Sequence, residues 1–135
     1  MDDYIDQIKA MSDKTRLKIL WLLNKAQTEL CICEIMDVIE DSHSNISRQL
    51  KILKTAKLVR ERKDGKWVYV RLIAPHDPFH DCLLQAVSRV PDGYFSGVAR
   101  KLTLRLGLRD GDRCVDGLRS EKWTRALCAL EKEDT

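Results

Sequence analysis

Five cysteines are the residues of this chain whose type and spacing are best suited to chemistry. Cys31 and Cys33 form a Cys-x-Cys pair, and the other three are scattered: Cys82, Cys114 and Cys128. The odd number and irregular spacing argue against a secreted disulfide framework. Free thiols can be small buried residues, metal ligands or redox sensors. Because thiolates are soft ligands, a site built on them favours As(III), Sb(III), Cd(II), Pb(II) or Zn(II) over Mg(II) or Ca(II).

Basic residues are concentrated in one stretch, residues 42–72. This stretch holds nine Lys or Arg residues and only two acidic ones, although the net charge of the whole chain is only +3. A phosphate backbone is the natural partner for such a local positive field, and a solvated basic surface is the alternative.

Periodic apolar residues predict the elements that must position these groups. Helices are expected over about residues 2–10, from the Ser12 or Asp13 cap to residue 26, over 30–39, 44–56 and 79–90. Alternating residues 58–62 and 67–72 flank Asp64-Gly65, which predicts a β-hairpin. This order predicts a mainly α fold, a winged helix-turn-helix with a two-stranded wing over residues 1–90, used for DNA binding and dimerisation.

The residues after Pro91 form a C-terminal extension, 91–135. Segments 94–106 and 122–130 are expected to be helical, with a Gly/Asp-rich stretch over 107–117 between them. The extension is too short for an enzyme domain, and a dithiol oxidoreductase lacks its usual βαβ context here, so we expect no enzymatic activity. An acidic start and no apolar run of about 20 residues indicate a cytoplasmic protein without a membrane partner.

The fourth helix is the expected DNA-reading helix because polar side chains surround its narrow apolar stripe. Asn45 and Gln49 suit adenine, and Arg48 suits guanine or phosphate. The full set of expected DNA contacts comprises this helix and the wing: Ser42, His43, Ser44, Asn45, Ser47, Arg48, Gln49, Lys51, Arg62, Lys63 and Lys66.

Four motifs resemble the ArsR/SmtB family of metal-responsive repressors. They are Met11-Ser-Asp-Lys-Thr-Arg-Leu-Lys-Ile-Leu, Glu29-Leu-Cys-Ile-Cys-Glu-Ile, Ser42-His-Ser-Asn-Ile-Ser-Arg-Gln-Leu-Lys-Ile-Leu and Lys63-Asp-Gly-Lys-Trp-Val-Tyr-Val-Arg-Leu. The resemblance covers about residues 3–90. It implies a homodimer formed through the first and fifth helices, bound to double-stranded operator DNA. It also implies repression of a resistance operon that is relieved when a metal or metalloid binds.

The Glu-Leu-Cys-x-Cys motif is most similar to the arsenic-sensing branch, and also to the cadmium/lead branch. The resemblance implies a ligand role for Cys31 and Cys33, with As(III) or Sb(III) as the inducer. Cd(II), Pb(II), Zn(II) or cysteine oxidation remain alternative signals. The arsenic pattern has a third cysteine three residues after Cys33, where this chain has Met36. Cys82, Cys114 or Cys128, from either subunit, or a small external ligand could complete the site.

The spacing of the two cysteines also suggests a mechanism. Positions i and i+2 of a helix are about 200° apart, so one ion cannot easily bind both thiolates of an intact helix. Binding is therefore expected to distort the start of the third helix, which leads into the reading helix.

A second metal site of the family lies on the fifth helix. His76, Asp77, His80 and Asp81 suggest such a site here, but no His or Glu follows them along that helix.

Overall fold

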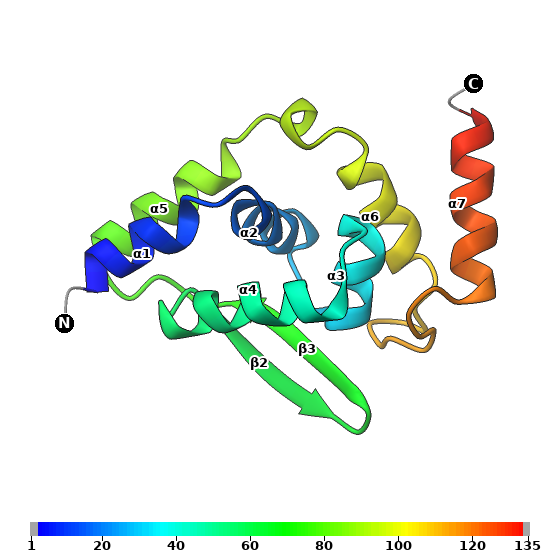
Figure 1. Ribbon diagram of the computed structural model, residues 1–135, viewed down its shortest axis with the longest axis horizontal. Coiled ribbons are helices and arrows are strands. Elements are labelled where there is room, and N and C mark those ends of the chain that lie inside the picture. Colours follow the sequence, from blue (N-terminus) through cyan, green and yellow to red (C-terminus); the bar gives the residue numbers. More distant parts are fainter. Residues whose placement is uncertain (1–2, 134–135) are drawn as a thin grey trace.

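The structure is a computed structural model that describes residues 3–133 of the 135-residue chain. Its elements follow the expected order (Figure 1): α1 Asp3–Met11, α2 Lys14–Ala26, β1 Leu30–Cys31, α3 Ile32–Ile39, α4 His43–Thr55, β2 Val59–Asp64, β3 Trp67–Leu72, α5 Pro78–Ser88, the 3-10 helix η1 Asp92–Phe95, α6 Val98–Leu106 and α7 Glu121–Glu133. Asp2, where the first helix was expected to begin, lies outside the described residues.

Helix α2 runs through the middle of the molecule and forms the centre of its core (Figure 1). The Asp13 side chain caps its start by accepting a hydrogen bond from the backbone N–H of Arg16, and Gln27 ends it in a left-handed conformation with φ of 53°. Five consecutive residues of the helix, from Ile19 to Leu23, are buried. This continuous buried run is covered by the neighbouring helices and by strand β3 of the wing, with which α2 is in contact.

The wing confirms the predicted hairpin and adds one short strand to it. Strands β2 and β3 pair in antiparallel register with Asp64 opposite Trp67, and Gly65 takes the left-handed turn conformation with φ of +60°. The sequence reading missed β1, in which Leu30 pairs with Val70 and Cys31 with Tyr69. The sheet is therefore three-stranded in the order β1-β3-β2. Two residues are too few to show an alternating pattern, so this strand had been included in the third helix.

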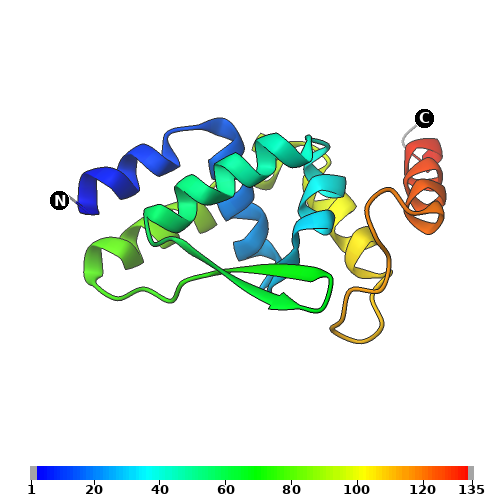
Figure 2. The same cartoon turned by 60° about the horizontal axis from the view of Figure 1, so that its bottom comes forward.

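The C-terminal extension packs against the rest of the chain. Phe95, Val98 and Leu102 belong to the same buried apolar cluster as α2. The expected helix over 94–106 begins later, at Val98, because Gly97 with φ of +79° separates it from the 3-10 turn. The loop after α6 lies beside the tip of the β2–β3 hairpin in both views of the ribbon (Figures 1 and 2). None of the helices within residues 3–133 is long and apolar enough to span a membrane.

Candidate metal centre and nucleic-acid interface

Three of the five thiols meet at one point, between the start of α3 and the loop after α6. The Sγ atom of Cys33 lies 3.1 Å from that of Cys31 and 3.7 Å from that of Cys114. All three Sγ atoms lie within 4.8 Å of one another, and among residues 3–133 no other group of three or more His, Cys, Asp or Glu side chains is gathered in this way. Two elements far apart in the sequence thus converge in a cluster of soft donor atoms.

Cys31 and Cys33 approach each other because Cys31 is not part of the helix. It is the residue before α3, with extended backbone angles of φ −68° and ψ 147°, and it belongs to β1. This corrects the expectation that the two thiols diverge by about 200° on one helix. Since the sulfur atoms already lie side by side, binding one ion does not require the first turn of α3 to unwind.

The loop after α6 contributes the third sulfur of the cluster, that of Cys114. From the sequence, Cys114 was one of three candidates for the third ligand. The backbone N–H of Cys114 donates to the phenol oxygen of Tyr69 at 3.0 Å, which ties the loop to strand β3. Cys114 and Tyr69 are buried. A cavity of about 330 Å³ between the loop and the hairpin tip is lined in part by Cys114, Trp67 and Asp64. This cavity gives a small ligand room next to the cluster.

The thiols influence one another's protonation. The Cys33 thiol donates a hydrogen bond to the sulfur of Cys31, which lowers the pKa of Cys31 to about 6 and raises that of Cys33. Burial raises the pKa of Cys114 to about 11. The cluster therefore contains one thiol that ionises readily near neutral pH, and the thiolate is the form that binds soft ions.

The remaining sulfur atoms lie elsewhere. Cys82 on α5 and Cys128 on α7 are exposed and belong to no such cluster. Met36, at the position where the arsenic pattern has its third cysteine, is buried in the main apolar core. Of the three candidates for the third ligand, the structure brings only Cys114 to the Cys31–Cys33 pair.

The donor set fits a small thiophilic ion. Three sulfurs and no carboxylate or imidazole form the group found within the described residues. Trivalent arsenic and antimony make three bonds to sulfur, whereas structural zinc sites are almost always four-coordinate. Soft ligands of this kind also exclude Mg(II) and Ca(II), which prefer oxygen.

The start of α4 presents the expected polar surface. The Ser42 side chain caps the helix by accepting from the backbone N–H of Asn45. The Asn45 amide donates to Asp41 at 2.6 Å, and its oxygen accepts from Arg48 at 2.7 Å. This chain of bonds fixes the direction in which the exposed Arg48 leaves the helix. Asn45 and Ser47 are half-buried, and the other expected contacts of this helix apart from Gln49 are exposed: Ser42, His43, Ser44, Arg48 and Lys51.

Gln49 is placed differently from what an adenine-reading residue requires. Its side chain is only 9% exposed. Its amide oxygen accepts from Arg16 on α2 at 2.7 Å, and its amide nitrogen donates to Asn45 at 3.1 Å. Gln49 therefore supports Asn45 from behind. The signal was present in the sequence, because Gln49 follows the buried Ile46 by three residues and shares its face of the helix.

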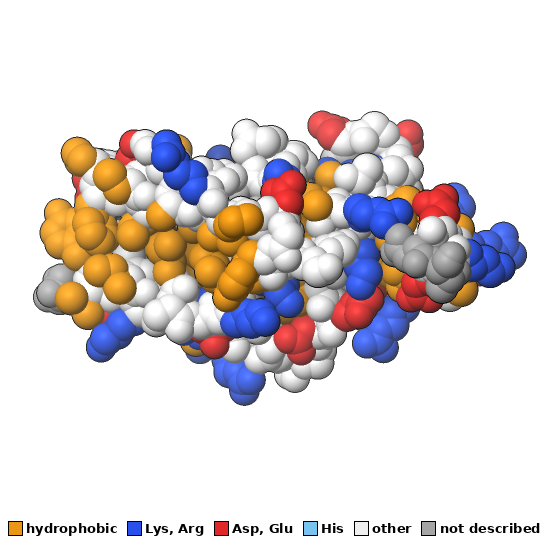
Figure 3. All heavy atoms as spheres, turned by 90° about the horizontal axis from the view of Figure 1, so that it is seen from above, with side chains coloured by type: hydrophobic (Ala, Val, Ile, Leu, Met, Phe, Trp, Pro, Cys, Tyr) orange, Lys and Arg blue, Asp and Glu red, His pale blue; other side chains and the backbone are white. Residues whose placement is uncertain are grey.

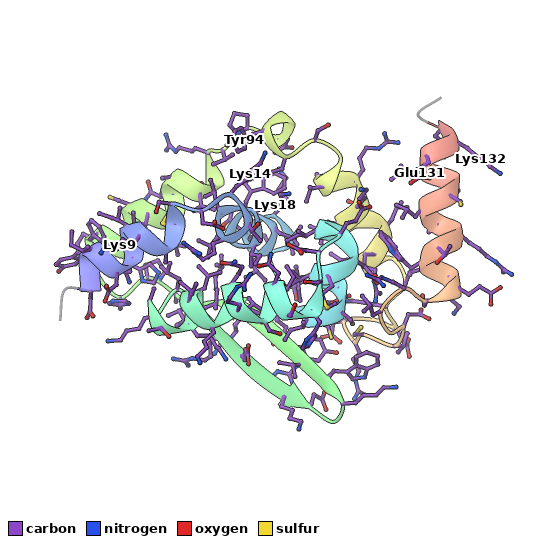
Figure 4. The ribbon with its side chains drawn as sticks, viewed as in Figure 1. Lys9, Lys14, Lys18, Tyr94, Glu131 and Lys132 are labelled. Atoms are coloured by element: carbon purple, nitrogen blue, oxygen red, sulfur yellow. The ribbon has the colours of Figure 1, made fainter. Side chains whose placement is uncertain are left out.

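The wing carries the other expected contacts. Arg62, Lys63 and Lys66 are exposed. The guanidinium of Arg62 lies over the Tyr69 ring at 4.7 Å and pairs with Glu29, whereas Lys66 lies over Trp67. Lys14 and Lys18 of α2 lie beside Tyr94, on the side of the molecule opposite to the wing (Figure 4). The basic residues near the reading helix and the wing therefore form a surface separate from these lysines.

An apolar surface lies at the end of the molecule formed by α1 and α5. Tyr4, Ile5 and Ile8 of α1 are 44–53% exposed, and Tyr4 packs edge-on against Phe79 of α5 at 4.8 Å. Figure 3 shows hydrophobic side chains gathered at this end, seen from above. Large exposed apolar patches of this kind mark interaction surfaces.

Fold and site together define a winged-helix DNA-binding protein that carries a cluster of potential thiolate ligands. Residues 13–61 match the sequence model of a bacterial regulatory protein family, the arsR family. The chain is 33% identical over 94 residues to the arsenic resistance transcriptional regulator ArsR1 of Pseudomonas putida, which covers 70% of this chain and 73% of the relative. The chain therefore belongs to the ArsR family, and the resemblance seen in its motifs is confirmed.

Other relatives and one solved structure agree with this assignment. The arsenical resistance operon repressor of Escherichia coli is 42% identical over 74 residues, which are 55% of this chain and 62% of the relative. The cadmium resistance regulator CadC homolog of Staphylococcus aureus is 39% identical over 74 residues, 55% of this chain and 60% of the relative. The chain thus matches about three fifths of the length of these two proteins. The structure of HlyU from Vibrio cholerae superposes with a TM-score of 0.56 and 27% identity, covering 65% of this chain and 90% of HlyU.

Proposed function

We propose that this protein is a transcriptional repressor whose operator complex is dissociated by As(III) or Sb(III) bound to Cys31, Cys33 and Cys114. The observation that carries the proposal is the convergence of these three sulfur atoms within 4.8 Å. The names of its relatives support the same reading, since they include arsenical resistance repressors. The molecule would act as a cytoplasmic homodimer joined through α1 and α5, with no catalytic activity of its own.

Ligand binding is an exchange of bonds that leaves the oxidation state of arsenic unchanged. Three thiols replace the three hydroxyl groups of arsenous acid, and three water molecules leave. Cys31 is the first thiol expected to react, because its pKa of about 6 keeps it largely ionised near neutral pH. In this proposal residues 91–135 serve as a ligand-donating extension to a DNA-binding body formed by residues 1–90.

The site lies close to the DNA-reading helix. Helix α3, which starts directly after Cys31, ends at Ile39, and α4 starts at His43. A change in the position of α3 is therefore passed on to α4 through only three residues. Shifting a repressor from 99% bound to 99% free requires the ligand to favour the free form by about 10⁴-fold, or about 5.5 kcal/mol. The proposal therefore requires arsenite to bind the DNA-free form more tightly by this amount, because equal affinity for both forms would release no DNA.

The experiment follows the anisotropy of a labelled fragment from the chain's own promoter while arsenite is added under reducing conditions. Arsenite is expected to release the wild-type protein and the two control variants Cys82→Ser and Cys128→Ser, whose thiols are exposed and isolated. Release should require at least tenfold more arsenite in Cys33→Ser and Cys114→Ser. Unchanged release in both cluster variants would refute the site.

Further titrations separate the alternative signals. Antimonite is expected to act like arsenite, and Cd(II) and Zn(II) to act only at higher concentration because they lack a fourth protein ligand here. Pb(II) is titrated beside them. Release by peroxide without any metal, reversed by a reductant, would instead identify the cluster as an oxidation sensor. The growth of sulfur-to-arsenic absorption bands during the titration counts the bound thiolates directly.

A further inference from the structure

Helix α6 and the loop that follows it each insert one arginine side chain into the body of the protein. Arg105 pairs with Asp37 at 3.0 Å, and both side chains are 1% exposed. Arg109, in the loop after α6, pairs with Glu34 at 2.6 Å, and these side chains are 4% and 0% exposed. Both carboxylates belong to α3. The extension is thus held on the helix that bears Cys33 by two buried ion pairs.

Each arginine also holds the loop that carries Cys114. The Nη2 atom of Arg105 donates to the backbone oxygens of Asp116 at 2.7 Å and Gly117 at 3.3 Å. Arg109 donates to the backbone oxygen of Asp112 at 3.4 Å. The residues on both sides of Cys114 are therefore bonded to guanidinium groups that are themselves fixed on α3.

The same network reaches the other two thiols. Glu34, the partner of Arg109, accepts a hydrogen bond from the backbone N–H of Cys31 at 2.8 Å. Arg105 Nη2 lies 3.8 Å from the Sγ atom of Cys33. One connected set of buried hydrogen bonds thus touches all three residues of the cluster or their immediate neighbours.

The packing of α6 against α3 does not by itself explain why charged side chains are buried between them. Well-packed apolar side chains of similar size generally stabilise a fold as well as a buried ion pair does. Apolar side chains, however, cannot donate to the carbonyl groups of a loop. What the arginines add is a fixed direction for the loop, since a planar guanidinium bonds several acceptors in a set geometry.

We propose that Arg105 and Arg109 are positioning residues that assemble the three-thiol site before the ligand arrives, by holding Cys114 against Cys31 and Cys33. This inference rests on the proposed function for its ligand but concerns the arrangement of the free protein. A preassembled site binds more tightly because the ordering of the loop is complete before binding. In their absence the ligand must order residues 107–117 itself, and its affinity falls.

The first test needs no metalloid. A variant with Cys31, Cys82 and Cys128 changed to Ser retains Cys33 and Cys114 as its only thiols, 3.7 Å apart. Dibromobimane becomes fluorescent when it bridges two thiols, so its rate of bridging reports their proximity. Arg105→Gln is expected to slow bridging at least fivefold. The matched control is Arg113→Gln, next to Cys114 but with its side chain 74% exposed, and it should bridge at the unaltered rate.

A second variant guards against simple loss of structure, because Arg105→Gln leaves the buried Asp37 carboxylate with only the backbone N–H of Arg119 as a partner. Changing Arg105→Met together with Asp37→Leu removes both charges and retains apolar packing between α6 and α3. Circular dichroism should be native in this double variant, yet bridging should remain slow. Bridging at the unaltered rate in a natively folded double variant would overturn the proposal, since packing alone would then position Cys114.

The second test measures arsenite affinity from the absorption bands in a double-mutant cycle. Arg105→Gln is expected to weaken binding at least tenfold in the wild-type background and less than twofold when Cys114 is already Ser. An equal loss in both backgrounds would show that Arg105 does not act through Cys114. Failure of the wild-type protein to bind arsenite would instead refute the proposed function, and the bridging rates would still decide the inference.

Discussion

Glu34 is the residue whose replacement has the largest stability effect that can be worked out from this structure. Its carboxylate is fully buried and accepts from Arg109 at 2.6 and 2.7 Å and from the backbone N–H of Cys31 at 2.8 Å. Glu34→Gln preserves the shape but leaves the buried guanidinium of Arg109 without a counter-charge. Breaking one partner of a buried ion pair costs about 3–5 kcal/mol.

We therefore expect Glu34→Gln to lower the free energy of unfolding by about 3–5 kcal/mol, a large share of the 5–15 kcal/mol typical of a domain. Urea denaturation followed by circular dichroism measures this change. Combining Glu34→Leu with Arg109→Met should restore most of the loss, because both charges are then removed together. A loss below about 1 kcal/mol in Glu34→Gln would refute the reasoning, since it would place the pair in contact with water.

Three further predictions follow from other parts of the structure. Met36→Cys should leave arsenite affinity within about twofold of wild type by absorption titration, because side chain 36 packs in the main apolar core whereas the three thiols belong to a separate buried cluster. Ile8→Glu should shift the protein toward monomer in analytical ultracentrifugation, because Ile8 is 47% exposed on the apolar α1–α5 surface. Burial and the nearby His76 lower the pKa of His80 below its ordinary 6.5. The unfolded chain then binds the extra proton first, so stability is complete above pH 6.5 and falls as the pH drops toward the lowered value. Urea unfolding at pH 7.5 and 5.5 should show this fall, and His80→Gln should reduce it.

The local features of the fold could be predicted from the sequence. Asp13, one of the two caps expected for the second helix, and Asp64-Gly65 as a hairpin turn act on residues within a few positions of themselves, and the structure has both. The ligand role expected of Cys31 and Cys33 came from the resemblance of their motif to a known family, and the structure places their Sγ atoms 3.1 Å apart. The predicted divergence of the two side chains was wrong, because Leu30 and Cys31 form strand β1, paired with the distant strand β3, where a helical turn was expected.

Contacts between residues that are distant in the sequence could not be predicted. Cys114 reaches Cys33 across 81 positions of sequence, and the bonds that bring it there come from Arg105 on α6, Arg109 in the following loop and Tyr69 on β3. One signal was available. Glu34 and Asp37 are three residues apart, which places both carboxylates on one face of α3. Two acidic residues on one face of a mainly apolar helix indicate that basic partners pack there, but not which segment supplies them.

The separate origins of the three sulfurs have a consequence for how such proteins can diversify. The surface expected to read DNA lies on α4 and the wing, whereas the third sulfur lies in a loop near the end of the chain. Ligand preference can therefore change through residues 107–117 alone, without altering the operator that is recognised. For the construction of biosensors, this loop is the part to vary: a library at residues around 114 would sample new inducers against a constant promoter.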